Sequence, residues 1–394
     1  MSKEFKPSNF LSDLKKNFGE SATIGFDDTF VVKDEDWFST GSLMLNLQLN
    51  GGKMNLGGIP AGKITVFAGG ESSGKTFIAI NVIKDFLEKN ENGYAIYFDS
   101  ESNVSADTFI NAGIPEEYID RIIIKRVITL EEFRTNIVQS YLKAIEAKIK
   151  MFVVLDSLGG LITQKELTEA EAKPNKEGVA EVKATVGRPQ QTIKQIMKII
   201  EHYAGKINSP VILISHVYAN IGSLFGGNTI AGGSGVRYFN SNCVEFSRSQ
   251  NKEGDGTIHA INGIVVTSKL VKSRFAREMT KVKSLINFNT GIEYYYGIVT
   301  LLELSGLIKK EGNRYLIEKD SDGKFVGKKY WARELLANLD LIKPFFESLE
   351  KWTISNFAIG KLSLSTKSSD VSFIEEGDKI DDFEEIITEE SENE

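Results

Sequence analysis

The sequence predicts an α/β fold in which helices flank a central, mostly parallel β-sheet. Three observations lead to this expectation. A glycine-rich loop at residues 69–76 separates a short apolar run from an amphipathic one. Apolar strand-like runs alternate with helical ones as far as residue 216, and two of the strand-like runs end in a carboxylate. Because parallel strands place their carboxyl ends at one edge of a sheet, the loop and the carboxylates are expected to lie close together.

The glycine-rich loop reads Gly-Gly-Glu-Ser-Ser-Gly-Lys-Thr and fits the pattern G-x-x-x-x-G-K-[ST]. Residues 64–68 predict the strand before it, and the apolar positions of residues 77–87 fall on one face of the helix after it. Backbone N–H groups in such a loop, together with the positive end of the helix, bind phosphate oxygens. We therefore predict a site for ATP or GTP, with a purely structural glycine turn as the alternative. The residues expected to contact the nucleotide are Gly69, Glu71, Ser72, Ser73, Gly74, Lys75, Thr76 and Phe77.

The side chains of this site predict specific roles. Lys75 is expected to reach the β- and γ-phosphates, and the Thr76 hydroxyl to hold Mg²⁺. Asp156 ends an apolar run and is expected to bind the same metal ion, directly or through water. Glu101 lies just after another strand-like run and is the candidate for orienting the water that attacks the γ-phosphate. A solvated acidic loop is the alternative interpretation of Glu101.

Further elements complete the expected sheet. Strands are predicted at residues 94–98, 122–124, 151–155 and 211–216, and helices near residues 130–148 and 190–203. Two strands at 264–274 and 282–288 predict a hairpin that extends the sheet. The hairpin carries four basic residues, Lys269, Lys272, Arg274 and Arg277. They are expected to form either a solvated basic edge or a group that stabilises the transferring phosphate.

Two irregular segments interrupt this pattern. Residues 163–189 are polar and poor in apolar residues, which is typical of a functional or disordered insertion. Residues 217–235 are rich in glycine but keep several apolar side chains. Such a loop can follow a sugar–phosphate backbone with its N–H groups and insert apolar wedges between bases, although a mobile surface loop fits the composition equally well. The residues expected to contact DNA are Gly222, Phe225, Gly226, Gly227, Asn228, Gly232, Gly233 and Arg237.

Composition and charge limit the class of protein. The 394 residues carry a formal net charge of −7, but the charged residues from Asp370 onward are acidic except Lys379, so the rest of the chain is mildly basic. This asymmetry favours a nucleic-acid-binding protein with an interacting or self-masking tail, and a merely solubilising tail is the alternative. The single cysteine, Cys243, excludes an intramolecular disulfide and is expected to be a small buried hydrophobe.

No apolar run is long enough to span a membrane, and the first residues lack the apolar core of a signal peptide. A cytoplasmic location is therefore expected, in the host cytoplasm if the protein is viral. The predicted organisation is an N-terminal helix and linker at 1–30, a core at 31–295, a small α+β domain at 296–364 and an acidic disordered tail at 365–394.

Together these motifs resemble the RecA family of DNA strand-exchange recombinases, and within it the phage proteins of the UvsX type. The resemblance runs from about Ser39 to Phe288 and continues loosely beyond it. It is carried by the loop at 69–76 and by four further runs: Phe98-Asp99-Ser100-Glu101, Val153-Val154-Leu155-Asp156-Ser157-Leu158, Ile214-Ser215-His216 and Val271-Lys272-Ser273-Arg274. The resemblance implies a RecA-like ATPase core.

By this resemblance, Lys75, Thr76 and Asp156 hold ATP and Mg²⁺, and Glu101 is the catalytic carboxylate. His216 would sense the γ-phosphate and pass its state to residues 217–235, the second DNA-binding loop, with residues 160–189 as the first. Lys272 and Arg274 would reach across the interface of a helical filament to the neighbour's ATP, and the N-terminal helix would pack on the adjacent subunit. One position departs from the family: where an adenine-stacking tyrosine is common, this chain has Thr108, with Phe109 beside it.

The resemblance implies an ATP-dependent recombinase that forms filaments on single-stranded DNA and exchanges strands with homologous double-stranded DNA. Its ATPase activity would depend on DNA, and single-strand-binding and recombination-mediator proteins are expected partners. Two other functions use the same ATP site. One is a hexameric, ring-forming DNA helicase of the RecA fold, and the other is a regulatory ATP-binding scaffold whose loops bind protein.

Overall fold

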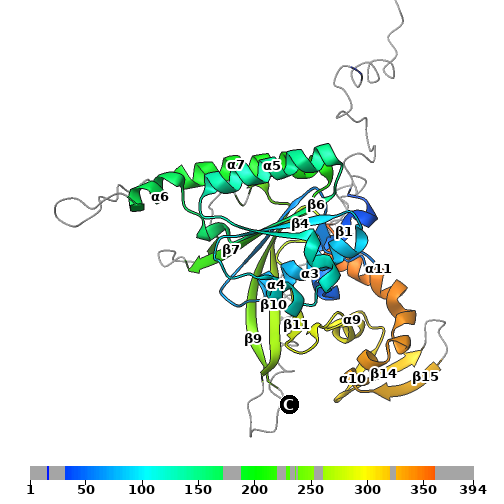
Figure 1. The fold of residues 1–394 in the computed structure, drawn as a ribbon. Helices are drawn as coiled ribbons and strands as arrows, with labels where there is room; N and C mark the ends of the chain where they lie inside the picture. The colour runs from blue at the N-terminus through cyan, green and yellow to red at the C-terminus, as the bar shows by residue number, and fades with distance from the viewer. Residues whose placement is uncertain are drawn as a thin grey trace, which may run out of the picture. The chain divides into compact units, whose positions relative to one another are not determined.

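The computed structural model describes residues 16, 32–171, 188–219, 228–230, 236, 238–252, 261–319 and 325–359. Its largest sheet has ten strands, of which nine form a continuous series and the tenth, β8 (Asn228–Ile230), pairs with the end of β7 (Figure 1). The series runs β12 (Gly291–Ile292), β11 (Lys281–Asn287), β10 (Ile261–Ser273), β9 (Asn242–Lys252), β3 (Ile64–Gly69), β7 (Val211–Ala219), β6 (Met151–Asp156), β4 (Tyr94–Asp99) and β5 (Ile122–Arg126).

The sheet is mixed but mostly parallel. The six strands from β9 to β5 pair in parallel, whereas β10, β11 and β12 continue the sheet in antiparallel pairs. Each parallel crossover carries a helix or a helical turn, which is the arrangement that brings the next strand back to the same edge. The predicted fold class, a central mostly parallel sheet flanked by helices, is therefore confirmed.

Helices cover both faces of this sheet, and neighbouring residues of one strand face opposite sides. Phe67 of β3 lies in an apolar cluster with the residues of α3 (Lys75–Lys89). Val66, the residue before it, lies in a second cluster with α5 (Leu130–Ala147) and α7 (Arg188–Ile207). Figure 1 shows α5 and α7 side by side over the sheet. Burial on both faces explains why the central strands are apolar along their whole length.

Smaller elements complete this part of the chain. They are β1 (Trp37–Phe38) paired with β2 (Ile59–Pro60), α2 (Leu43–Asn50), α4 (Ala106–Asn111) and α6 (Gln164–Glu171). The 3₁₀ turns are at Asp34–Asp36, Glu116–Arg121 and Leu158–Gly160. Two elements lie in segments that the sequence indicated to be irregular: α6 at the start of the polar insertion, and β8 within the glycine-rich segment.

The C-terminal part contains a small antiparallel sheet and short helices. Its strands are β13 (Lys309–Glu311), β14 (Arg314–Lys319) and β15 (Phe325–Tyr330), and its helices are α9 (Ile298–Leu304), α10 (Ala332–Ala337) and α11 (Phe346–Phe357). The sequence predicts one helix around Trp331 to Glu350, and this prediction is wrong. Asn338 leaves the helical conformation, and Pro344 lies in one of two 3₁₀ turns that separate α10 from α11.

A third apolar cluster joins α2 to the C-terminal part. It contains Leu43 and Leu47 of α2 together with Ile298, Leu302 and Leu349. The predicted domain boundary near residue 295 stays a prediction, but apolar packing continues across it. The expected N-terminal helix, apart from Lys16, and the acidic tail lie outside the described residues. In the described part of the chain, every helix is too short or too polar to cross a membrane.

Candidate nucleotide-binding site

The glycine-rich loop joins the carboxyl end of β3 to the first turn of α3. Lys75 opens the helix, and its buried ammonium turns back into the loop, where Nζ donates to the carbonyl oxygens of Gly69 at 3.0 Å and Gly70 at 2.5 Å. Ser73 Oγ donates to the same Gly70 oxygen at 2.8 Å. Burial lowers the pKa of Lys75, and the nearby carboxylates Asp156 and Glu101 oppose that effect. The loop therefore holds one partly desolvated cation at the helix N-terminus, where anions bind.

Two of its positions require glycine, Gly74 mainly for its backbone conformation and Gly69 for the space around it. Gly74 has φ +88°, and a Cβ added there would lie 2.8 Å from Ile286 Cδ1. A Cβ on Gly69 would lie 2.5 Å from the backbone oxygen of Phe246. Since β9 and β11 lie against the loop, it takes this course only without side chains at these positions.

Asp156 lies beside the loop at the end of β6. Its Oδ2 accepts hydrogen bonds from Thr76 Oγ1 and from the hydroxyl of Tyr97, both at 2.6 Å. Burial raises the pKa of Asp156, and the two donors act in the opposite direction. The predicted proximity of Thr76 and Asp156 is thus observed. Within the described residues, no group of three or more His, Cys, Asp and Glu side chains forms a metal cluster.

Glu101 and His216 meet at the same edge of the sheet. Glu101 Oε1 lies 2.7 Å from His216 Nε2 and accepts a 2.6 Å hydrogen bond from Ser157 Oγ. His216 is level with Gly69 in the register of β7 and β3, which places this group next to the phosphate loop. Partial burial acts to raise the pKa of Glu101, but hydrogen bonds from Ser157 and His216 outweigh it, so the pKa lies below its ordinary value.

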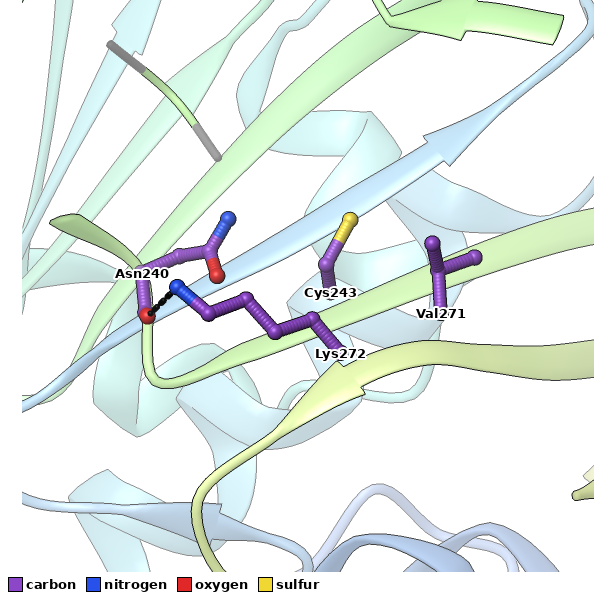
Figure 2. Close-up of a pocket in the computed structure, with 4 residues that line it drawn as sticks. All are labelled: Asn240, Cys243, Val271 and Lys272. Atoms are coloured by element: carbon purple, nitrogen blue, oxygen red, sulfur yellow. Dashed lines mark hydrogen bonds between the residues drawn. The ribbon is translucent and has the colours of Figure 1, made fainter. Parts of the chain in front are cut away.

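Lys272 and Arg274 are not brought to this site. Lys272 pairs in register with Cys243, which pairs with Val66, so it lies about 10 Å along β3 from Gly69 at the usual rise of a strand. Its Nζ donates to the backbone oxygen of Asn240 at 2.9 Å (Figure 2). The cavity in Figure 2, of about 170 Å³, is lined by Asn240, Cys243, Val271 and Lys272.

Arg274 also contacts residues of its own chain away from the phosphate loop. Its Nη1 lies 3.9 Å from Glu201 Oε1 of α7, a long and largely exposed ion pair. Lys272 is therefore level with Val66 in the amino-terminal half of β3 and Arg274 lies further toward its amino end, whereas Lys75 and Glu101 are at its carboxyl end. Within one subunit they do not share a site.

Three residues of the site were not assigned from the sequence. Tyr97 and Ser157 donate to the two carboxylates, as described above. Asp99 is buried and accepts from the backbone N–H groups of Glu101 at 3.0 Å and Ser102 at 2.8 Å, which fixes the turn that carries Glu101. Each of the three carries a hydroxyl or a carboxylate near the end of an otherwise apolar strand, and that pattern could have identified them.

Other predicted contacts are placed less directly. Phe77 is half-buried against the first apolar cluster. Thr108 takes part in the cap of α4, and Phe109 is buried edge-on against Tyr97 at 5.4 Å, so Phe109 belongs to the core. Asn228 is in β8. The remaining predicted DNA contacts lie outside the described residues, and they are Gly222, Phe225, Gly226, Gly227, Gly232, Gly233 and Arg237.

Known proteins similar in sequence to this chain include recombination and repair proteins. The chain is 26% identical over 313 residues to a recombination and repair protein of Enterobacteria phage T4, covering 78% of this chain and 75% of the relative. It is 25% identical over 318 residues to protein RecA of Mesoplasma florum, with 79% and 86% covered. For protein RecA of Synechococcus elongatus the identity is 28% over 315 residues, with 79% and 80% covered.

The model of the RecA N-terminal domain matches residues 7–293, which include the phosphate loop, both carboxylates and His216. This match covers well over half of the chain. The chain belongs to the RecA family, whose members are ATP-dependent DNA recombination and repair proteins.

Proposed function

We propose that this RecA-family, DNA-dependent ATPase assembles into helical filaments on single-stranded DNA and drives pairing and strand exchange with homologous double-stranded DNA. The observation that carries the proposal is the contact between Glu101 and His216, at 2.7 Å. It joins the phosphate site to the strand β7, whose last residues, 217–219, pair with β8 inside the proposed DNA-binding segment. A change at the phosphate that alters the contacts of His216 would pass along β7 directly into that segment.

The residues around the loop fit ATP with Mg²⁺. Thr76 Oγ1 and Asp156 Oδ2 are hard oxygen donors that already converge to 2.6 Å, and Mg²⁺ prefers oxygen ligands, often with water between. When bound, Mg²⁺ would neutralise charge on the phosphate oxygens. Lys75 would exchange the Gly69 and Gly70 carbonyls for phosphate oxygens, and the N–H groups of the loop would bind the remainder.

Glu101 supports hydrolysis as an oriented, ionised carboxylate. Its lowered pKa keeps it unprotonated near neutral pH, and Oε1 is held by two donors. In the proposed mechanism it positions the attacking water and accepts its proton. His216 contacts the γ-phosphate in exchange for part of its contact with Glu101, and ATP thereby shifts the population of filament states toward the one that holds DNA.

Lys272 and Arg274 are proposed to serve the neighbouring subunit's ATP. Support comes from their place level with the amino-terminal half of β3, away from the phosphate loop of their own chain. In a head-to-tail filament, one end of each subunit faces the opposite end of the next. We further propose that single-strand-binding and mediator proteins are partners of this protein. The N-terminal helix is proposed to pack on the adjacent subunit, and the proposed location is the cytoplasm.

The test is the ATPase rate with and without single-stranded DNA, for the wild type and for Lys75→Ala. We expect DNA to stimulate the wild-type rate and Lys75→Ala to abolish hydrolysis, because the loop then has no cation for the phosphates. Joint molecules between single-stranded DNA and a homologous duplex should form only with the wild type. A preparation that binds ATP but shows neither DNA stimulation nor joint molecules would contradict the proposal.

A further inference from the structure

Two donors hold the same oxygen of Glu101. Ser157 Oγ lies 2.6 Å and His216 Nε2 lies 2.7 Å from Oε1. The other oxygen, Oε2, is contacted by the exposed Asn103 Nδ2 at 3.3 Å. Two short hydrogen bonds therefore hold Oε1, whereas among the described residues Oε2 accepts only the longer, exposed hydrogen bond from Asn103.

Ser157 is itself fixed much more firmly than its two neighbours in this group. It is completely buried, whereas the side chains of His216 and Glu101 are 25% and 32% exposed. Ser100 Oγ accepts from the backbone N–H of Ser157 at 2.9 Å and donates to its carbonyl oxygen at 2.7 Å. The backbone N–H of Ser100 in turn donates to the oxygen of Asp156 at 2.8 Å. These bonds tie together the ends of β4 and β6, so the Ser157 hydroxyl has little freedom to turn elsewhere.

His216, in contrast to Ser157, is placed where its hydrogen bonds can change. It lies on β7, three residues before the end of the strand, and the strand continues into the pairing with β8. A residue that reports the γ-phosphate must change its hydrogen bonds when ATP binds. If His216 were the only donor to Oε1, Glu101 would lose its orientation in the state that hydrolyses ATP.

We propose that Ser157 is a positioning residue that keeps Glu101 aligned after His216 changes its hydrogen bonds. Ser157 donates to Oε1 throughout the cycle and transfers no proton, while Oε2 faces the attacking water. The inference rests on the proposed function, because it presumes that Glu101 is the catalytic carboxylate. Ser157 is then the static donor to Oε1 of Glu101, and His216 is the switching donor to the same oxygen.

The experiment measures kcat and KM for ATP in Ser157→Ala. A hydrogen bond to a charged group that is lost only from the catalytic geometry should lower kcat about tenfold or more, with KM for ATP within about twofold. In the proposed cycle, the state that holds DNA is the one in which His216 has turned to the γ-phosphate of ATP, so the fold loss should be larger with single-stranded DNA than without it. Equal losses in the two states would overturn the division between a static and a switching donor.

Ser209→Ala is the matched control. Ser209 is also completely buried, and its hydroxyl donates to the backbone oxygen of Met151 at the opposite end of β6. Both variants remove one buried hydroxyl beside β6, one at each end of the strand, so a general loss of stability should affect both melting temperatures. Only Ser157→Ala should lower kcat. An unchanged kcat in Ser157→Ala, or the same fall in Ser209→Ala, would overturn the inference.

A double-mutant comparison separates this inference from the proposed function. In a Glu101→Gln background, Ser157→Ala should cause no further loss in single-turnover rate, because Ser157 acts through the carboxylate. An equal loss in both backgrounds would show that Ser157 acts independently. If Glu101→Gln alone left kcat unchanged, the proposed role of Glu101 would fail, whatever Ser157→Ala does.

Discussion

Gly70 and Gly74 belong to the same phosphate loop, but a side chain would meet different surroundings at the two positions. At Gly74, φ is +88° and a Cβ would lie 2.8 Å from Ile286 Cδ1. At Gly70, a Cβ would meet no atom within 4 Å. Gly74→Ala should therefore lower the free energy of unfolding by about 1–3 kcal/mol, through the strained backbone and the contact with β11. Thermal unfolding without nucleotide measures this.

The matched control is Gly70→Ala. Nothing crowds the added methyl group, so the free energy of unfolding should stay within about 0.5 kcal/mol of the wild type. Since both variants add one methyl group to one loop, the difference between them isolates the backbone and contact terms. Equal melting temperatures for the two variants would contradict the assignment of Gly74 as a position that requires glycine.

The ionisation of Glu101 leads to a prediction about the pH dependence of kcat. The charged or titratable groups that face it are Lys75, His216 and Asp156, and the Ser157 hydroxyl donates to it. Removing that donor in Ser157→Ala should raise the pKa of Glu101, since the hydrogen bond favours the ionised form. Glu101 works as a base, so the acidic limb of the kcat–pH profile should move to higher pH. The limb in Ser209→Ala should stay in place, and a shift to lower pH in Ser157→Ala would contradict the prediction.

Residues of this site differ in how far the sequence alone could assign them. Lys75 and Thr76 lie inside one contiguous motif, and Asp156 ends a strand at the predicted edge, so their proximity was predictable. Tyr97 and Ser157 donate to carboxylates on other strands or loops. Such pairs depend on strand register and on side-chain direction, which a single sequence without homologues does not fix.

At the scale of whole elements, the strongly apolar strands and the amphipathic helices were predictable because burial imposes a period on the sequence. Helix α6 and strand β8 were not. None of the residues of α6 is buried, so it has no apolar face to reveal it, and β8 is short and lies among glycines. The interruption between α10 and α11 was predictable from Pro344, because a proline ring disfavours a continuous helix.

The pairing of strand β8 with β7 leads to a prediction about the response to DNA. It pairs antiparallel with the end of β7 through Val217↔Ile230, Tyr218↔Thr229 and Ala219↔Asn228. In Thr229→Pro, the ring and the missing N–H should disrupt this short pairing. Because the phosphate site does not involve β8, ATPase activity without DNA should stay within about twofold, while stimulation by single-stranded DNA should be lost.

Thr229→Ala is the control for Thr229→Pro, because it removes the side chain but keeps the backbone N–H. Rates measured at saturating ATP over a range of single-stranded DNA concentrations distinguish weaker DNA binding from a lost response. DNA stimulation that survives in Thr229→Pro would show that the pairing of β7 with β8 does not carry the signal.

The third apolar cluster determines whether a chain truncated near residue 295 can stay folded. Leu43 and Leu47 of α2 are buried against residues of α9 and α11, and Thr353 Oγ1 donates to the Gly52 oxygen at 2.7 Å. A chain ending at residue 295 should expose this face of α2 and aggregate, whereas a chain ending at 359 should stay folded. Soluble yield and thermal unfolding compare the two, and a stable, monodisperse 1–295 chain would contradict the prediction.

Lys75 follows the carboxyl end of β3, whereas Lys272 is level with its amino-terminal half, and this separation leads to a prediction for the assembled protein. Lys75→Ala and Lys272→Met should each abolish ATP hydrolysis, the first by disabling a subunit's own phosphate loop and the second by disabling the neighbour's. In a mixture of the two variants, however, a Lys272→Met subunit keeps an intact loop, and an adjacent Lys75→Ala subunit supplies an intact Lys272. In an equal mixture, roughly a quarter of the interfaces should combine both intact groups, as expected for random head-to-tail assembly.

ATPase rates on single-stranded DNA, measured across mixing ratios at constant total protein, test this arrangement. The rate should be greatest near the equal mixture and should fall toward zero at both ends. The double variant Lys75→Ala/Lys272→Met, mixed with either single variant, is the control and should restore nothing, because no interface then contains both groups. If Lys272 instead acted within its own subunit, every mixture of the two single variants would stay inactive, since no subunit holds both lysines.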